Sequence, residues 1–432
     1  MAKCLPSFLR QFFLCGQAMT VTKQVANKIR MAPISMPLNP FRACFISMKE
    51  VPHMRTRAMK MSKASCFFDM IAAKVDLPLL TMKHGTKISF NSRMAWLLQA
   101  AIALTFMVIL AGSVVRATGS GMGCPDWPKC FGLLIPPTDV EQVTWHANSD
   151  YSQGQMIVRD EALWQANLDF TTAESWDKSQ WTVYTRHDYA IFNPVHTWIE
   201  YINRLFGALL GLPMLIATGM AFTVMRSRPR LLGGMMLAMF FLGFEAWLGK
   251  LLVDGHLIPQ QITLHMVGAF ALLAVLVNVL RSVKPMGQHS DQSKLRVKVK
   301  RWAIAVIVLL AVQVVLGTQV REQIDVLLKT FGVHDSRLAW MGQLDITVLV
   351  HRSFSWMLLI ASWYLHRAYK AWQPSSPLTL MLLIGFVLIA VLGAMMYYLS
   401  IPAVIQPAHL LLTAVTWMIG VDVLVRSWQS TN

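Results

Sequence analysis

Histidine is the residue type with the greatest chemical potential in this chain, and four of its twelve histidines occupy similar positions. His196, His265, His351 and His409 each lie near the start of a long apolar segment. Ionisable side chains are costly in a bilayer, so those found there are candidates for function. His351 and His409 come from one half of the chain and could supply two imidazoles to a haem iron. Zinc is disfavoured because no third or fourth ligand accompanies them, and hydrogen bonding of each ring to a neighbour is the structural alternative.

The first half of the chain offers a different set of side chains. Here the corresponding pair is Asn203 and His265, and an amide is a poor axial ligand for iron. His196, Glu200 and Asn203 follow one another at spacings of four and three, which places them on one face of a helix. A carboxylate beside a histidine in an apolar helix could act as an acid or base, or stabilise a cation. The alternative is an interfacial Glu200 that pairs with Arg204.

Other charged residues stand at or within the apolar segments. Arg116 and Arg321 end two of these segments on the same side, where their forked donors would suit haem propionates. Ordinary anchoring at the membrane interface explains them equally well. Glu245 interrupts the third segment, and the sequence suggests no partner or role for it.

Two cysteines lie close together between the first and second apolar segments. Cys124 and Cys130 enclose the sequence Pro-Asp-Trp-Pro-Lys, which fits neither a redox nor a zinc Cys-x-x-Cys motif. In an oxidising compartment outside the membrane, such a pair could form a disulfide.

Composition shows what must position these residues. Of the 432 residues 55% are hydrophobic and 14% charged, and the mean hydropathy is +0.46. Soluble domains carry about 25% charged residues, which argues against an ordinary soluble enzyme. The stretch from Ala371 to Val421 contains no Asp, Glu, Lys or Arg, and one span needs about 20 apolar residues. The sequence therefore predicts an all-α polytopic membrane protein. Its eight expected spans are 95–115, 197–225, 231–253, 257–280, 302–320, 343–365, 378–400 and 404–425.

The connecting loops predict an orientation. Residues 226–230 and 281–301 are strongly basic, whereas the loop 117–190, here called the acidic loop, holds four Lys/Arg and ten Asp/Glu. Positive loops stay inside, so both termini are expected in the cytoplasm, or in the matrix of a mitochondrion, with the acidic loop outside.

Short matches between the two halves predict an internal duplication. Gly112–Arg116 matches Gly317–Arg321, Asn203–Phe206 matches His351–Phe354, and Leu248-Gly249 precedes His265 as Leu392-Gly393 precedes His409. Four helices per half give both halves the same orientation, with a pseudo-two-fold axis along the membrane normal. The expected fold is two duplicated four-helix bundles, residues 91–283 and 302–432, joined by a basic linker at 284–301.

The first 90 residues are expected to form a separate basic leader. Residues 1–93 hold fifteen Lys/Arg and three Asp/Glu and so carry much of the net charge of +17. A mitochondrial transit segment, a polybasic tail and a wrongly assigned start codon all fit this composition. Nucleic-acid binding is not expected, because no folded basic module is recognisable.

The residues 112–132, GSVVRATGSGMGCPDWPKCFG, resemble the signature of haem A synthases, membrane enzymes that convert haem O to haem A. The resemblance covers about 90–425, and Cys-Pro-Asp-Trp-Pro is its most specific part. It implies a haem b cofactor in the C-terminal half and oxidation of the C8 methyl of haem O to a formyl by successive hydroxylations.

Individual roles follow from the resemblance by position. It implies that His351 and His409 are axial ligands of haem b, Glu200 is catalytic, and His265 binds the iron of the substrate haem. Cys124 and Cys130 match the family's cysteine pair. The chain departs from the family at Asn203, where many members have a histidine, and His196 is the substitute that the sequence offers.

The resemblance also implies partners and a location. Haem O is the expected substrate, delivered by a haem O synthase, while the electron donor and homo-oligomerisation are left open. We expect the bacterial cytoplasmic membrane, with the mitochondrial inner membrane as the alternative. A di-haem electron-transfer cytochrome would require two equivalent bis-histidine sites, which Asn203 opposes. A transporter built from repeats would favour polar residues at mid-depth, whereas here they gather toward one side.

Overall fold

The computed structural model describes residues 89–185, 191–254, 259–284, 293–331, 342–399 and 401–429. The chain divides into two units, residues 1–85 and 86–432. The whole described part belongs to the second unit, so the expected basic leader lies outside the described residues except at its end, where α3 begins.

Eight described helices are long and apolar enough to cross a membrane, which confirms the predicted polytopic architecture. They are α3 (Phe90–Thr118), α4 (Pro194–Thr223), α5 (Pro229–Asp254), α6 (Pro259–Val283), α7 (Ser293–Phe331), α9 (Ile346–Trp372), α10 (Leu378–Tyr398) and α11 (Ile405–Trp428). Local signals set their ends. Ser89 caps the start of α3, Gly119 ends it with φ 70°, and Asn193 followed by Pro194 starts α4. Because α7 begins at Ser293, part of the expected linker 284–301 is helical.

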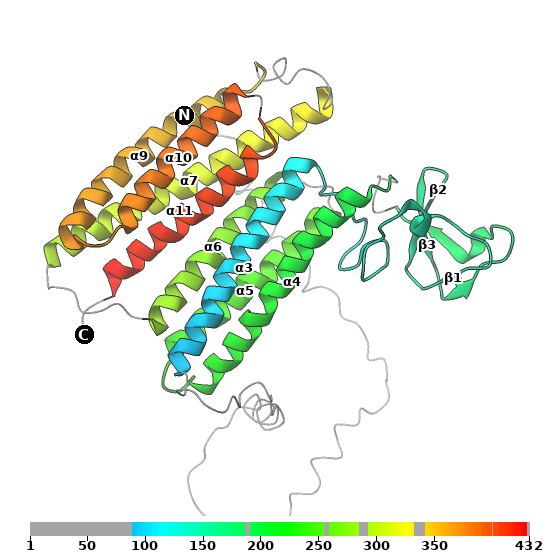
Figure 1. The fold of residues 1–432 in the computed structure, drawn as a ribbon, viewed down its shortest axis with the longest axis horizontal. Helices are drawn as coiled ribbons and strands as arrows, with labels where there is room; N and C mark the ends of the chain where they lie inside the picture. The colour runs from blue at the N-terminus through cyan, green and yellow to red at the C-terminus, as the bar shows by residue number, and fades with distance from the viewer. Residues whose placement is uncertain are drawn as a thin grey trace, which may run out of the picture. The chain divides into compact units, whose positions relative to one another are not determined.

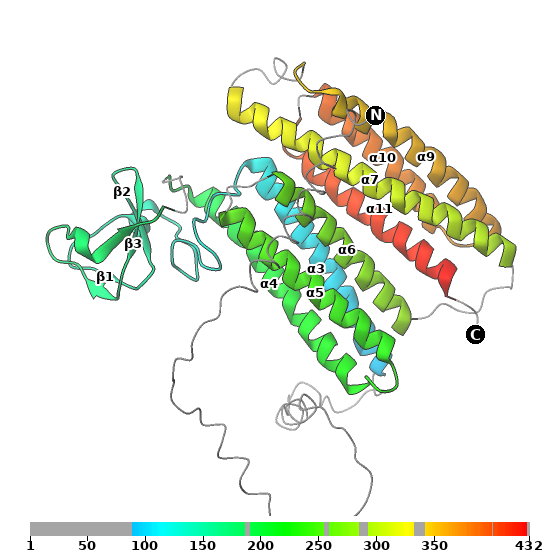
Figure 2. The ribbon, with the colours of Figure 1, turned by 180° about the vertical axis from the view of Figure 1, so that it is seen from behind.

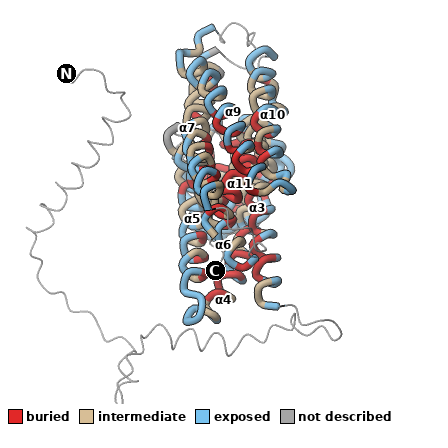
Figure 3. The backbone as a smooth tube through the Cα atoms, turned by 90° about the vertical axis from the view of Figure 1, so that its left-hand side faces the viewer, coloured by how far each residue is buried: buried red, intermediate tan, exposed pale blue. Residues whose placement is uncertain are grey.

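The helices form two groups of four that meet at α11 (Figure 1). One apolar core is shared by α3, α4, α5 and α6, and the other by α7, α9, α10 and α11. Helix α11 contributes Ala414 and Val421 to the first core and Ile419 and Val423 to the second. It is the most buried of the eight spans, and Figure 3 shows the buried residues gathered in the interior of the helix assembly.

Packing order within the two groups is the same. Helix α3 packs on α4 as α7 packs on α9, and α5 packs on α6 as α10 packs on α11. This order supports the internal duplication, which we retain as a proposal. Polar contacts also join the groups: Asp422 of α11 accepts hydrogen bonds from Arg281 of α6 and Arg426, and Trp417 Nε1 donates to the Phe270 carbonyl at 2.9 Å.

The acidic loop carries structure that the sequence did not predict (Figure 2). It contains β1 (Asp150–Tyr151), β2 (Met156–Arg159), β3 (Ala162–Ala166), β4 (Phe170–Thr171) and β5 (Trp181–Val183). β1 pairs with β4, and β3 pairs with both β2 and β5, all antiparallel. Aromatic side chains such as Trp164 and Trp181 form its small core, and Arg159 stacks 4.4 Å from the Trp176 ring. Strands this short show little alternation in the sequence, so sequence patterns do not reveal them.

Candidate functional site

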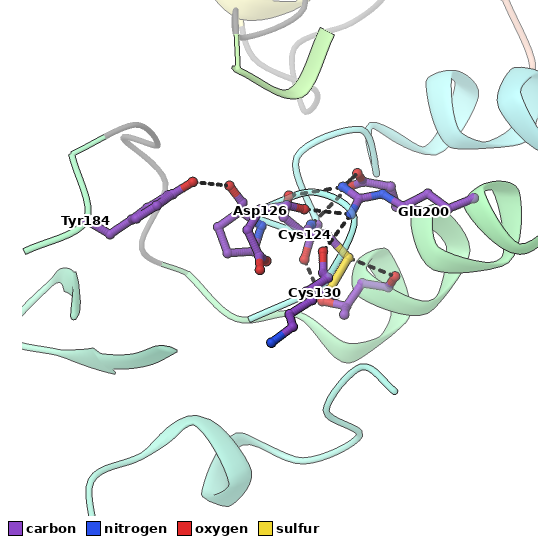
Figure 4. Close-up of polar contacts among 10 residues, drawn as sticks. Cys124, Asp126, Cys130, Tyr184 and Glu200 are labelled. Atoms are coloured by element: carbon purple, nitrogen blue, oxygen red, sulfur yellow. Dashed lines mark hydrogen bonds and ion pairs between the residues drawn. A yellow bond between two sulfur atoms is a disulfide. The ribbon is translucent and has the colours of Figure 1, made fainter. Parts of the chain in front are cut away.

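The start of α4 is covered by the segment that carries the two cysteines, as Figure 4 shows. Cys124 and Cys130 form a disulfide and are both fully buried. The segment lies tightly on the helix, because a Cβ on Gly123 would lie 2.6 Å from the backbone carbonyl of His196. Thr197 Oγ1 donates to the Gly123 carbonyl at 2.8 Å. The disulfide loop, residues 123–132, is therefore fastened directly onto the helix that carries Glu200.

Glu200 is buried beneath this loop and both of its carboxylate oxygens are engaged. The side chain is 6% exposed. Its Oε2 accepts a hydrogen bond of 3.0 Å from the backbone N–H of Cys124, and its Oε1 accepts one from Arg204. The sequence left pairing with Arg204 open as an alternative, and the structure contains that ion pair. Because the carboxylate lies in a largely dry site beside a buried cation, it is held in one orientation.

Arg204 links the carboxylate to the loop. Its Nη1 donates to the carbonyls of Asp126 at 2.6 Å and Lys129 at 2.8 Å. One guanidinium thus holds Glu200 on one side and two loop carbonyls on the other. Through these contacts the disulfide loop and Glu200 form a single site, although they are far apart in the sequence.

Asp126 at the centre of the loop is a second buried carboxylate. Its Oδ2 accepts a hydrogen bond of 3.0 Å from the Gly132 N–H, whereas its Oδ1 is buried without a partner. Burial raises the pKa of Asp126 above its ordinary value, and the backbone N–H of Gly132 and the charge of Arg204 oppose that shift. Gly132 has φ 75°, a left-handed conformation that suits glycine. Tyr184 closes the loop by donating to the Pro125 carbonyl at 3.1 Å.

Asn203 and His265 are the corresponding pair of the first half. Asn203 lies beside Gly112 of α3, where a Cβ would lie 3.5 Å from its Oδ1, and that oxygen is buried without a partner. His265 of α6 places its Nδ1 2.8 Å from Oε2 of Glu245 on α5. This contact was missed by sequence reasoning. The only available signal was a charged residue inside an otherwise apolar span.

His351 and His409 are the residues of the second half that the sequence matches to Asn203 and His265. The rings come from α9 and α11 and are close enough for a charge on one to affect the other. Each ring lies beside a glycine. A Cβ added to Gly317 would lie 3.1 Å from Cε1 of His351, and a Cβ added to Gly393 would lie 3.5 Å from Cε1 of His409. The Nδ1 atoms of both are buried without a hydrogen-bond partner. Two imidazoles whose Nδ1 atoms lack hydrogen-bond partners, each with a glycine beside it, fit a planar cofactor held by nitrogen ligands.

The described residues contain no group of three or more His, Cys, Asp or Glu side chains that could hold a bare metal ion. The donor set of these helices is therefore a pair of imidazoles in one half, and one imidazole with an amide in the other. This suits a macrocycle that brings four ligands of its own to the iron.

Arg116 and Arg321 are paired within the protein. Arg116 Nη2 lies 2.6 Å from Oδ2 of Asp325, and Arg321 Nη2 lies 3.0 Å from its Oδ1. Arg321 also donates to the Arg116 carbonyl at 3.1 Å. These contacts join α3 to α7 and so connect the two groups of helices. Asp325 was missed at the sequence level because it follows Arg321 by one turn, near the end of the span.

His196 lies in the first turn of α4 and is half-buried. It precedes Asn203 by seven residues, which corresponds to about 10 Å along a helix. Its backbone lies against Gly123 of the disulfide loop. His196 is thus about 10 Å along the helix from Asn203, the residue matched to His351.

Comparison with known proteins agrees with these features. The sequence profile of a family described as cytochrome oxidase assembly protein matches residues 95–421, which include all eight helices in whole or in part. The chain belongs to this family. No solved structure matches it.

Three bacterial relatives, each named heme A synthase, are similar to this chain. The protein of Nitrosomonas eutropha is 28% identical over 75% of this chain and 91% of its own length. That of Bartonella tribocorum is 22% identical over 78% of this chain and 91% of its own length. That of Shewanella oneidensis is 24% identical over 45% of this chain and 46% of its own length.

Proposed function

We propose that this protein is a haem A synthase, which oxidises a methyl group of haem O to a formyl group by successive hydroxylations. The observation that carries the proposal is the unequal pair of sites. The second half offers two imidazoles, whereas the first offers one imidazole, His265 beside Glu245, and the separate buried carboxylate of Glu200. Family membership and relatives named heme A synthase support it.

The second half is proposed as the site of a resident haem b, with His351 and His409 as axial ligands. A bound haem would supply one-electron redox chemistry at this position. The protein's contribution is to present both rings within an apolar bundle and to leave room beside them at Gly317 and Gly393.

The first half is proposed as the site of the substrate haem O, with His265 as its axial ligand. Glu200 is the proposed catalytic residue. Positive charge that develops at the methyl carbon during its oxidation would be stabilised by a fixed carboxylate. Arg204 and the Cys124 N–H contact both carboxylate oxygens and fix their orientation, which favours charge stabilisation over proton transfer as the role of Glu200.

The disulfide loop and its partners have a proposed positioning role. Arg204 and the Cys124 N–H hold Glu200, and the loop excludes water from it. His196 lies under the same loop, and we retain it as a second candidate ligand for the substrate haem. Arg116 and Arg321 remain candidates for propionate binding, which would require exchange of their contacts with Asp325.

The di-haem cytochrome alternative is weakened by Asn203, whose buried oxygen has no partner and whose amide cannot replace an imidazole. For the location we propose the bacterial cytoplasmic membrane with both termini inside, because the relatives are bacterial and the basic loops favour this orientation. Haem O would come from a haem O synthase.

Haem extraction tests the proposal. The chain is expressed in a host that makes haem O but lacks its own haem A synthase, and haems are separated by chromatography. We expect haem A to appear with haem b bound to the purified protein. If haem O stays unconverted although the purified protein contains haem, the proposed enzymatic function is refuted and the di-haem cytochrome is favoured.

A further inference from the structure

The strongest feature that the proposed function leaves unused is Glu245. It is a carboxylate within the membrane part of α5, its side chain is 11% exposed, and its Oε2 lies 2.8 Å from Nδ1 of His265. Its Oε1 is buried without a partner. Such a group is costly in an apolar helix, so its presence calls for a compensating role.

A second residue of α6 makes the space for this carboxylate. Gly268 follows His265 by three residues, and a Cβ at Gly268 would overlap Oε1 of Glu245. The carboxylate group therefore fits against bare helix backbone one turn beyond the imidazole. This arrangement fixes where Glu245 sits and which nitrogen of His265 it meets.

The same arrangement is absent from the second half. Aligning Gly249 with Gly393 and His265 with His409 places Ile389 at the position of Glu245 and Leu412 at that of Gly268. The ring of His409 lies against the backbone of Ile389. The carboxylate thus occurs only in the half where Asn203 replaces the second histidine.

We propose that Glu245 is a positioning residue, which holds His265 through Nδ1 so that Nε2 is the single strong axial ligand of the substrate haem in this half. A carboxylate on the far nitrogen selects the tautomer, fixes the ring orientation and increases the donor strength of the coordinating nitrogen. This compensates for Asn203, which offers the iron no imidazole. The inference rests on the proposed function, because haem O is taken as the ligand.

Two substitutions separate orientation from charge. Glu245→Gln keeps an oxygen that can accept from Nδ1 but removes the negative charge, whereas Glu245→Leu removes both. Gly268→Ala leaves the carboxylate in the chain but displaces it. Lys250→Gln is the matched control, because Lys250 is an exposed charge on the same helix.

The test uses the purified full-length protein in detergent, titrated with haem O, and has two readouts other than activity. The affinity for haem O is expected to fall about 10–100-fold in Glu245→Leu and less in Glu245→Gln, the range found for lost partners of metal ligands. The iron–histidine stretching band of the ferrous protein is expected to move to lower frequency in Glu245→Gln, because the imidazole becomes a weaker donor. Lys250→Gln should change neither, and an unchanged haem b spectrum shows that each variant is folded.

A double substitution decides whether Glu245 compensates for Asn203. Asn203→His should supply the second imidazole and give a six-coordinate low-spin haem, and adding Glu245→Gln to it should then cost little affinity. An unchanged band and affinity in Glu245→Gln and Glu245→Leu would overturn the inference. If the wild-type protein binds haem O without converting it, the proposed function fails. The iron–histidine stretching band would still test the positioning role of Glu245 in that case.

Discussion

Replacing Glu200 by Gln tests the proposed catalytic role most directly. The substitution keeps the shape of the side chain and an acceptor for the Cys124 N–H, but it removes a charge that is only 6% exposed and paired with Arg204. Arg204 would keep its bonds to the carbonyls of Asp126 and Lys129. The guanidinium is thus not left wholly unpaired, and we expect a loss of stability below the roughly 3–5 kcal/mol of a fully broken buried pair.

The effect on the reaction should be larger than the effect on the fold. Loss of one preorganised electrostatic group typically lowers the rate about 100–1,000-fold. We therefore expect haem A formation to fall by that factor, with haem O or a hydroxylated intermediate accumulating and haem b content unchanged. The assay is chromatography of haems extracted from membranes and from the purified protein.

The matched control is Glu141→Gln, which removes a charge that is 73% exposed in the acidic loop. It should leave haem A formation at the wild-type level. A normal yield of haem A from Glu200→Gln would refute the catalytic role and leave Glu200 as the partner that holds Arg204 and the disulfide loop in place.

Three further predictions concern the remaining site residues. His351→Ala and His409→Ala should each abolish the low-spin haem b spectrum of the purified protein while membrane insertion persists, and an unchanged spectrum in both would exclude them as ligands. Thiol labelling of the native protein without reductant should leave Cys124 and Cys130 unmodified, since both are buried and bonded, and full labelling of both would contradict the disulfide. His196→Ala should lower the affinity for haem O if His196 is an axial ligand, whereas an affinity equal to wild type would assign it to the loop interface alone.

Much of the membrane architecture could be predicted from the sequence by itself. Long uncharged stretches such as 371–421 leave the chain no alternative to helices in a bilayer, because every backbone polar group must be satisfied within the segment. The position of each histidine along its helix could also be predicted, because residue spacing in a regular helix converts directly into distance along the helix axis. The matched segments indicated which histidines correspond, and the structure places Gly112 beside Asn203 as Gly317 stands beside His351.

Only the tertiary structure decided which side chains meet. Glu245 and His265 are on different helices, as are Arg116 and Asp325, and no local pattern links such pairs. The fold of the acidic loop over Glu200 depends on contacts between Arg204 and carbonyls more than 70 residues away in sequence. Helical periodicity determines the face on which a residue lies, whereas its partner is selected by how neighbouring helices pack, and that packing depends on the whole chain at once.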